Sequence, residues 1–383
     1  MATGTPATTK AIVYVEKGKA EIQEVSVPKV RDDYILVKVK AVGLNPADWK
    51  IIHGDWADAG TRSGCDFAGE VVGIGPNVTK DIKKGDRIAG FTHGGNRLNH
   101  DTGAFGGYAL VKQHMQMKIP EHVSDEEAAT LGVSVTTVGQ GLYSALGLPL
   151  PNRPAKEPFP VLIYGGSTAT GIYGIQYAKA SGLTVIATAS PRNSALLRSL
   201  GADAVLDYRS PACAADIRAL AGGRLLRHAW DCTGDGAAIC AAALSSSSGS
   251  GDDDDDDDDE KEGRGGGEGG GSGGAPKYAT IAFVDGDVVR RINPAVEGPL
   301  FTLAYDAFGT DYANWNGLVT AKPEERDFAA AFWELSAELV GNGTVKLLRP
   351  TVNRGGPGLE GVLRGLDDLK NGKVSGTKLV YTL

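Results

Sequence analysis

The clearest pattern of hydrophobic and polar positions lies between Pro160 and Ser190. An apolar run at 161–164 is followed by a Gly-Gly-Ser-Thr turn, a helical pattern at 171–180, and a second, β-branched apolar run at 183–188. Strand, glycine turn, helix and parallel strand form the first unit of a dinucleotide-binding fold. Glycines in such a turn let the backbone approach a pyrophosphate, and the helix start offers free N–H groups to its oxygens. The pattern therefore predicts a βαβ unit with a nucleotide phosphate at its turn.

The turn departs from the usual fingerprint of this unit, because hydroxyl residues and an alanine stand where later glycines are expected. Their hydroxyl groups can donate to phosphate oxygens instead. A βαβ unit that binds no ligand is the alternative interpretation. The residues that we expect around the cofactor phosphates are Gly165, Gly166, Ser167, Thr168, Ala169 and Thr170.

The residues after the second apolar run indicate which nicotinamide cofactor binds. An NAD site usually has Asp or Glu there to hold the ribose hydroxyls, but this chain continues Ser-Pro-Arg-Asn without an acid. Ser190 and Asn193 can donate to a 2′-phosphate, and Arg192 can pair with it through two parallel hydrogen bonds. We therefore predict NADPH rather than NADH. A solvated surface arginine at a helix start is the alternative for Arg192.

Short apolar or alternating runs dominate residues 11–130, and glycine-rich turns separate them. Many short strands with glycine corners indicate a small, mostly-β domain. At its end, Ser124 and Glu127 have the spacing of a capping box and predict a helix start that leads into a long helical crossover. A length of 383 residues is too great for one core and indicates two domains.

The composition of the chain argues against several classes of function. The net charge of −8 is inflated by the acidic run Asp252–Glu260, and no basic patch indicates nucleic-acid binding. Four cysteines without metal-ligand spacing are typical of free thiols in a reducing compartment. The chain lacks a signal-peptide pattern and an apolar run long enough to span a membrane, so we expect a cytoplasmic protein. The Ser-, Gly- and acid-rich stretch at 245–276 predicts a disordered insertion, either without a role or docking a basic partner.

The order of several motifs resembles that of the medium-chain dehydrogenase/reductase superfamily, on its zinc-free side. The motifs are Asn45–Asp48, Gly64–Gly69, Gly85–Arg87, Gly103–Tyr108 and Gly201–Asp203. Within the superfamily, the segments 164–170, 190–193 and 206–209 look most like fungal trans-acting enoyl reductases of the lovastatin-pathway type. Such enzymes serve a partner polyketide synthase whose own enoyl reductase domain is inactive.

The resemblance implies an α/β protein with a Rossmann-type NADPH-binding domain and a GroES-like, mostly-β catalytic domain. We place the catalytic domain at 1–130 and 320–383, and the cofactor domain at 131–319 with the insertion inside it. We expect no metal site, because Cys65 has no partner at ligand spacing. His93 and His100 lie among Gly and Asn, and we expect both to be solvated loop residues.

Without a metal, other groups must stabilise the enolate that hydride transfer creates and protonate its α-carbon. Lys50 matches a lysine that follows the Asn-Pro-Ala-Asp motif in the trans-acting enoyl reductases, and we expect it to donate a proton or hold the cofactor. An exposed surface lysine is the alternative. Thr136 and Thr137 either bond the cofactor's carboxamide or bond backbone carbonyls.

The resemblance implies further contacts to the cofactor from Ala47, Asp48, Trp49, Lys50, Tyr208, Val374 and Ser375. It implies contacts to substrate from Val133, Thr136, Thr137, Leu303 and Tyr305.

Three functions remain open at this point. The first is an NADPH-dependent enoyl reductase that acts on a carrier-bound polyketide of a partner synthase. The second is a stand-alone zinc-free quinone or alkenal reductase. The third is a cofactor-binding protein with little catalysis. The motifs favour the first, although most of them lie in the cofactor domain, which does not choose substrates.

Overall fold

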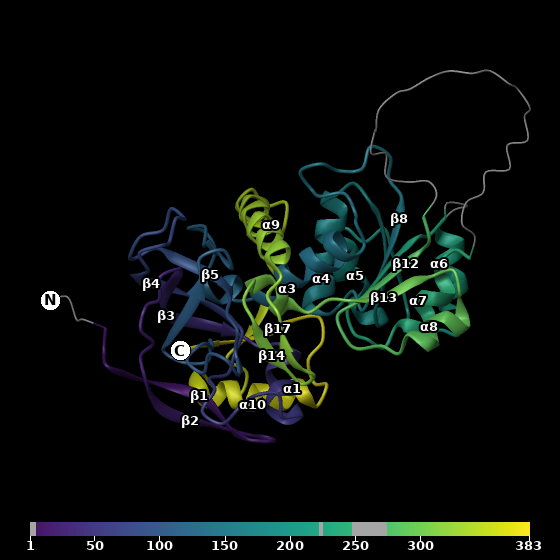
Figure 1. Ribbon diagram of the computed structural model, residues 1–383. Helices are drawn as coiled ribbons and strands as arrows, with labels where there is room; N and C mark the ends of the chain where they lie inside the picture. The colour runs from purple at the N-terminus through teal and green to yellow at the C-terminus, as the bar shows by residue number, and fades with distance from the viewer. Residues whose placement is uncertain (1–4, 222–224, 247–273) are drawn as a thin grey trace, which may run out of the picture. The chain divides into compact units, whose positions relative to one another are not determined.

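A computed structural model describes residues 5–221, 225–246 and 274–383 (Figure 1). The chain divides into two compact units. Unit 1 comprises Met1–Gln140, Ser167–Tyr173 and Leu303–Leu383, and unit 2 comprises Gly141–Gly166 and Gly174–Thr302. Each unit is described by itself below.

Unit 2 contains a six-stranded parallel sheet in the order β10-β9-β8-β11-β12-β13. Its strands are β8 (Pro160–Tyr164), β9 (Thr184–Thr188), β10 (Ala204–Leu206), β11 (His228–Asp231), β12 (Lys277–Thr280) and β13 (Glu297–Phe301). The strand order reverses beside β8, so the carboxyl end of β8 lies at the point where open α/β sheets bind their ligands. The predicted Rossmann-type sheet is confirmed.

Helices cover the two faces of this sheet because its strands are apolar on both sides. The helices are α4 (Ala169–Ala180), α5 (Ser194–Ser199), α6 (Cys213–Leu220), α7 (Ala237–Ala243) and α8 (Gly286–Ile292). Figure 1 shows α6, α7 and α8 together on one face, where they pack on Ala229 and Tyr278. On the other face the fully buried Trp230 meets α4 so closely that a Cβ on Gly174 would lie 2.5 Å from its ring.

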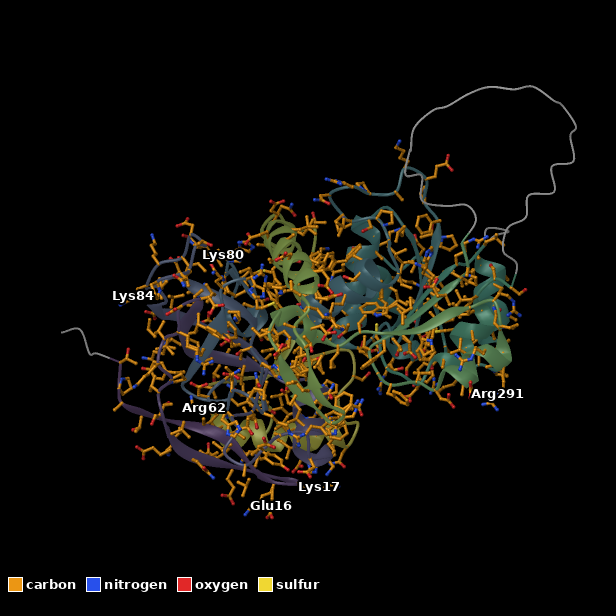
Figure 2. The ribbon with its side chains drawn as sticks, viewed as in Figure 1. Glu16, Lys17, Arg62, Lys80, Lys84 and Arg291 are labelled. Atoms are coloured by element: carbon orange, nitrogen blue, oxygen red, sulfur yellow. The ribbon has the colours of Figure 1, made fainter. Side chains whose placement is uncertain are left out.

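Unit 1 is built on a seven-stranded sheet in the order β16-β17-β3-β4-β5-β7, with β6 paired to β3. Its strands are β3 (Tyr34–Gly43), β4 (Asp66–Ile74), β5 (Arg87–Phe91), β6 (Tyr108–Lys112), β7 (Gln116–Lys118), β16 (Pro350–Val352) and β17 (Lys378–Thr382). Two hairpins add β1 (Thr8–Glu16) with β2 (Lys19–Ser26), and β14 (Tyr312–Asn314) with β15 (Gly317–Val319). Figure 2 labels Glu16 and Lys17 at the turn of the first hairpin.

The helices of unit 1 are α1 (Pro46–Gly54), α2 (Asp125–Ala128), α3 (Gly132–Val138), α9 (Pro323–Gly341), α10 (Gly358–Lys370) and the 3-10 helix η3 (Ala304–Phe308). The capping box is confirmed, since the Ser124 hydroxyl accepts the Glu127 N–H at 3.2 Å and the Glu127 carboxylate accepts the Ser124 N–H at 3.2 Å. The long helical crossover expected after it is present, but in three pieces. The Thr130 hydroxyl bonds back to the Glu127 carbonyl at 2.6 Å and ends α2, α3 starts again at Gly132, and the π-helix η1 (Gly139–Ala145) follows.

Unit 1 also contains residues 131–140 and 303–319, which the sequence analysis placed in the cofactor domain. The physical reason is that α3 packs against β5 and α9, and η3 packs against α9.

The predicted insertion at 245–276 falls mostly on residues 247–273, which lie outside the described residues. Within the described part of the chain, no helix is both long and apolar enough to cross a membrane.

Candidate functional site

The glycine turn after β8 has the backbone that a close approach requires. Gly165 has a φ of +77°, a conformation that L side chains rarely adopt. A Cβ on Gly166 would lie 3.1 Å from Ala187 and 3.1 Å from Leu197. Both glycines are tied to the end of β9, because their N–H groups donate to the hydroxyl and the carbonyl of Thr188 at 3.1 and 2.9 Å. The two glycines therefore keep side chains out of the turn.

The residues that follow the glycines form the start of α4. The Thr168 hydroxyl accepts the Gly171 N–H at 2.9 Å, as an N-cap residue does. The Ser167 carbonyl accepts the Gly376 N–H at 3.3 Å. The structure thus brings the segment that contains Val374 and Ser375 next to the helix start, although some 200 residues separate the two in sequence, and Ala169 and Thr170 occupy the first turn of α4.

The residues proposed to select NADPH lie at the carboxyl end of β9. Ser190 is half-buried, Asn193 is buried and Arg192 is exposed. Arg192 forms no hydrogen bond or ion pair with any residue that the structure describes. The neighbouring acid, Asp207, is held by the Arg209 guanidinium at 2.7 Å, and this bond is the main reason that the pKa of Asp207 is lowered.

Tyr208 lies between these two charged residues in sequence and presents an exposed ring. Its ring contacts Tyr164 edge-on, with 6.1 Å between ring centroids, and the Arg209 guanidinium lies 6.0 Å from its centroid. The glycine turn, Arg192 and Tyr208 all follow the carboxyl ends of strands of unit 2, the edge at which open α/β sheets bind their ligands.

Asp231 organises the loop after β11, and its role was not foreseen in the sequence. Its buried carboxylate accepts the N–H groups of Thr233 at 2.8 Å, Gly234 at 3.0 Å and Gly236 at 2.8 Å. It also accepts the hydroxyls of Thr233 at 2.8 Å and Tyr278 at 3.0 Å. A strand-ending Asp followed by Thr-Gly is the signal that would have identified it.

In unit 1, α1 presents the residues of the Asn-Pro-Ala-Asp motif in two directions. Ala47, Trp49 and Lys50 are half-buried, and the Lys50 ammonium lies 5.9 Å from the Trp49 ring centroid. Asp48 is instead 1% exposed, and its Oδ2 accepts the Asn45 N–H at 2.7 Å. Asp48 therefore points into unit 1, whereas Lys50 reaches its surface.

A buried ion pair lies beneath α1. The Lys378 ammonium donates to Asp66 Oδ2 at 2.5 Å and to Asn45 Oδ1 at 2.7 Å, and both charged side chains are at most 1% exposed. Asp66 Oδ1 accepts the Val133 N–H at 2.7 Å, so the start of α3 is fixed to the same carboxylate. Sequence reasoning missed Lys378, because 312 residues separate it from its partner.

The threonines of α3 bond within their own helix. The hydroxyls of Thr136 and Thr137 donate to the carbonyls of Gly132 at 3.3 Å and Val133 at 2.7 Å. Both side chains are buried, and Thr136 also accepts the Trp333 indole N–H at 3.2 Å. The bonds of the two threonine hydroxyls to backbone carbonyls match the alternative stated for them, in which they do not bond the cofactor's carboxamide.

Tyr305 lies at the centre of an aromatic cluster. Its ring stacks on His93 with centroids 4.0 Å apart and an interplanar angle of 8°, and its hydroxyl lies 3.7 Å from the Cys65 thiol. Leu303, two residues earlier, accepts the Gln140 side-chain amide on its carbonyl at 3.2 Å. The strand β13 ends at Phe301, and Tyr305 lies in the following helix η3.

The expectation that His93 is a solvated loop residue is wrong. It is 7% exposed, and burial lowers its pKa to about 3, so the ring is neutral. The stacked aromatic rings replace water around it. His100 is exposed, as predicted. Among the described residues, no group of three or more His, Cys, Asp or Glu side chains is placed to hold a metal ion.

Comparison with known proteins agrees with this architecture. Residues 31–121 match the alcohol dehydrogenase GroES-like domain, and residues 169–249 match the zinc-binding dehydrogenase domain. The solved structure of the CurK enoyl reductase covers 98% of this chain and 99% of its own, with a TM-score of 0.71 and 18% identity. Mycobacterial Rv1454c complexed with NADPH covers 98% and 100%, with a TM-score of 0.67 and 21% identity. At these identities the likeness shows the fold alone.

Two curated relatives are similar over nearly the whole chain, and a third over about half of it. The trans-enoyl reductase ACTTS2 of Alternaria alternata is 41% identical over 98% of this chain and 99% of its own length. The trans-enoyl reductase resD of Aspergillus sclerotiorum is 37% identical over 97% and 99%. The trans-enoyl reductase TOXD of Cochliobolus carbonum is 50% identical over 55% of this chain and 70% of its own. The resemblance inferred from the sequence motifs is confirmed, and this chain belongs to the trans-enoyl reductases, oxidoreductases with a GroES-like domain and a Rossmann-type domain.

Proposed function

We propose that this protein is an NADPH-dependent, trans-acting enoyl reductase of the cytoplasm. It reduces the α,β-double bond of a carrier-bound polyketide intermediate that a partner synthase supplies. The full-length similarity to proteins named trans-enoyl reductases supports this proposal most strongly. The reduced nicotinamide supplies a hydride to the β-carbon, and the protein must then stabilise the enolate and protonate its α-carbon.

The preference for NADPH is supported by the residues at the carboxyl end of β9. Arg192 is exposed and unpaired within the described residues, and the sequence from Thr188 to Asn193 contains no acid that would repel a 2′-phosphate. Ser190 and Asn193 flank Arg192, and Tyr208 offers an exposed ring for the adenine. Gly165 to Thr170 hold the pyrophosphate, and the segment of Val374 and Ser375 lies against the start of α4.

The choice of cofactor is tested by Arg192→Ala. We expect kcat/KM for NADPH to fall about 10- to 100-fold, since a charge-assisted hydrogen bond contributes about 1.5–3 kcal/mol, and kcat/KM for NADH to change little. Arg198→Ala is the matched control, because Arg198 is an exposed arginine of neighbouring α5 that bonds the Asp203 carbonyl at 3.2 Å. An equal loss with both cofactors would contradict the assignment.

Lys50 is proposed to donate to the cofactor or to the developing enolate, with Ala47 and Trp49 beside it. Val133, Thr136, Thr137, Leu303 and Tyr305 are proposed to line the substrate. Lys50→Ala should lower kcat/KM, whereas Lys17→Ala, at the exposed turn shown in Figure 2, should leave it unchanged.

The reaction itself is tested by NADPH oxidation with a crotonyl thioester and with a simple quinone, assayed in parallel. Oxidation with the thioester alone supports the enoyl reductase. Oxidation with the quinone alone would establish a stand-alone quinone reductase instead, and cofactor binding without turnover of either would establish a non-catalytic protein.

A further inference from the structure

The start of α4 is anchored within unit 1 by hydrogen bonds. Residues 167–173 group with unit 1, whereas the rest of α4 groups with unit 2. The Ser167 carbonyl accepts the Gly376 N–H at 3.3 Å, and the Tyr173 hydroxyl bonds two further segments of unit 1. A dinucleotide-binding fold holds the cofactor phosphates at this helix start, so these bonds fix the proposed phosphate site within unit 1.

Tyr173 is the inner of these anchors, and it is fully buried. Its hydroxyl lies 2.6 Å from Thr130 Oγ1 and accepts the Leu348 N–H at 3.2 Å. Tyr173 and Thr130 are 0% exposed, and Leu348 is 4% exposed. Burial raises the pKa of the Tyr173 phenol to about 12, so the hydroxyl keeps its proton at neutral pH. Three distant segments of the chain therefore meet at one buried hydroxyl.

The direction of these hydrogen bonds follows from the number of protons. The Thr130 hydroxyl has one proton, which it donates to the Glu127 carbonyl at 2.6 Å. Thr130 Oγ1 can therefore only accept from Tyr173. The bonds run one way, from the Leu348 N–H to Tyr173, from Tyr173 to Thr130, and from Thr130 to the Glu127 carbonyl. Removing the Tyr173 hydroxyl would leave the buried Leu348 N–H without its acceptor.

The same chain of bonds also reaches the start of α3. The bond from Thr130 to the Glu127 carbonyl ends α2, and α3 begins two residues later at Gly132. Helix α3 carries Val133, Thr136 and Thr137, which are proposed to line the substrate. One buried set of hydrogen bonds thus joins the helix start proposed for the cofactor phosphates to the start of the helix proposed for the substrate.

We propose that Tyr173 is a positioning residue that sets the placement of the nicotinamide against the double bond to be reduced. The proposal rests on the proposed enoyl reduction. Tyr173 acts through Thr130 and the start of α4, and it takes no part in the transfer of hydride or proton. Hydride transfer requires close and oriented reactants, and a misplacement of about 1 Å can lower a rate about 100-fold.

The first test removes the hydroxyl and keeps the ring, as Tyr173→Phe. We expect kcat with NADPH and a crotonyl thioester to fall about 10- to 100-fold, while KM for the thioester changes little. The primary isotope effect on kcat, measured with NADPH deuterated at the transferred position, should increase, because hydride transfer becomes slow relative to product release. A merely structural role would lower the melting temperature and leave the isotope effect unchanged.

Tyr143→Phe is the matched control at the other end of α4. Tyr143 is 7% exposed, and its hydroxyl lies 2.9 Å from the Oγ of Ser181, the residue that follows α4. Both substitutions remove a buried tyrosine hydroxyl, so we expect similar losses in melting temperature. Only Tyr173→Phe should change kcat and the isotope effect.

The second test changes the acceptor and decides the matter even where Tyr173→Phe does not fold. Thr130→Val keeps the shape of the side chain without its hydroxyl, and Thr130→Ser keeps the hydroxyl. We expect Thr130→Val to lower kcat and raise the isotope effect as Tyr173→Phe does, and Thr130→Ser to stay near the wild type. The double variant Tyr173→Phe/Thr130→Val should be no slower than the slower single variant, because both changes break the same bond.

The negative outcomes are distinguishable. A wild-type protein that binds NADPH but does not reduce the thioester would overturn the proposed function and this role with it. An active wild-type protein whose Tyr173→Phe and Thr130→Val variants keep its kcat and isotope effect would overturn the positioning role alone. An equal loss of kcat in Tyr143→Phe would overturn it as well.

Discussion

Removing one partner of the buried pair of Lys378 and Asp66 should strongly destabilise unit 1, and Lys378→Met tests this. Methionine fills a similar volume but removes the cation. Asp66 would then be left in the interior with only the Val133 N–H at 2.7 Å as a partner, and the side-chain oxygen Oδ1 of Asn45 would lose its 2.7 Å donor. Breaking a buried ion pair on one side costs about 3–5 kcal/mol. We expect a loss of unfolding free energy in that range.

Urea unfolding followed by tryptophan fluorescence measures the loss, since four of the five tryptophans, at 49, 56, 315 and 333, lie in unit 1. Lys38→Met is the matched control, because Lys38 is an exposed lysine of β3 in the same sheet; its effect should stay within about 0.5 kcal/mol. Adding Asp66→Asn to Lys378→Met removes the unpaired charge and should recover part of the stability. A loss below about 1 kcal/mol for Lys378→Met, or no recovery in the double variant, would refute this account of the pair.

Three further predictions follow from buried groups. Folding raises the pKa of Asp48 to about 7, so between about pH 4 and 7 the folded state binds more protons than the unfolded state. The free energy of unfolding should therefore decline as the pH rises over that range. In thermal unfolding, Asp48→Asn should cost less stability at pH 8 than at pH 5. Gly174→Ala places a Cβ 2.5 Å from the Trp230 ring and should lower the free energy of unfolding by about 1–3 kcal/mol. Gly341→Ala is the control, because a Cβ at Gly341 meets open space and should be neutral or stabilising. Equal effects of the two substitutions would contradict the close packing of α4 on Trp230. Asp231→Ala leaves the N–H groups of Thr233, Gly234 and Gly236, the last of them buried, without an acceptor. It should cost about 3 kcal/mol and weaken NADPH binding measured by fluorescence titration. An unchanged melting temperature would contradict the role of Asp231 in the loop.

Local signals in the sequence were sufficient to predict elements of both units. The apolar runs around Gly165, the helix start at Ser124 and the glycine-separated strands predict structure from neighbouring residues alone, because turns, caps and hydrophobic periodicity act over a few positions. The order of the motifs also predicted the family. The break between α2 and α3 was not visible in this way, because the Thr130 hydroxyl that ends α2 also bonds the distant Tyr173 at 2.6 Å.

Only the tertiary structure decided how the chemically active groups of unit 1 are arranged. His93 was expected in solvent from its Gly- and Asn-rich surroundings, and the rings of η3 bury it instead. Asp48, Cys65 and Tyr305 lie up to 257 positions apart in the sequence, and burial raises the pKa of each, with smaller effects from their neighbours. The sequence by itself determined which residues could form strands, turns and helix ends, and therefore the fold. Burial and long-range pairing, which depend on residues far away in the chain, decided which carboxyl is paired as a salt bridge and which can hold a proton.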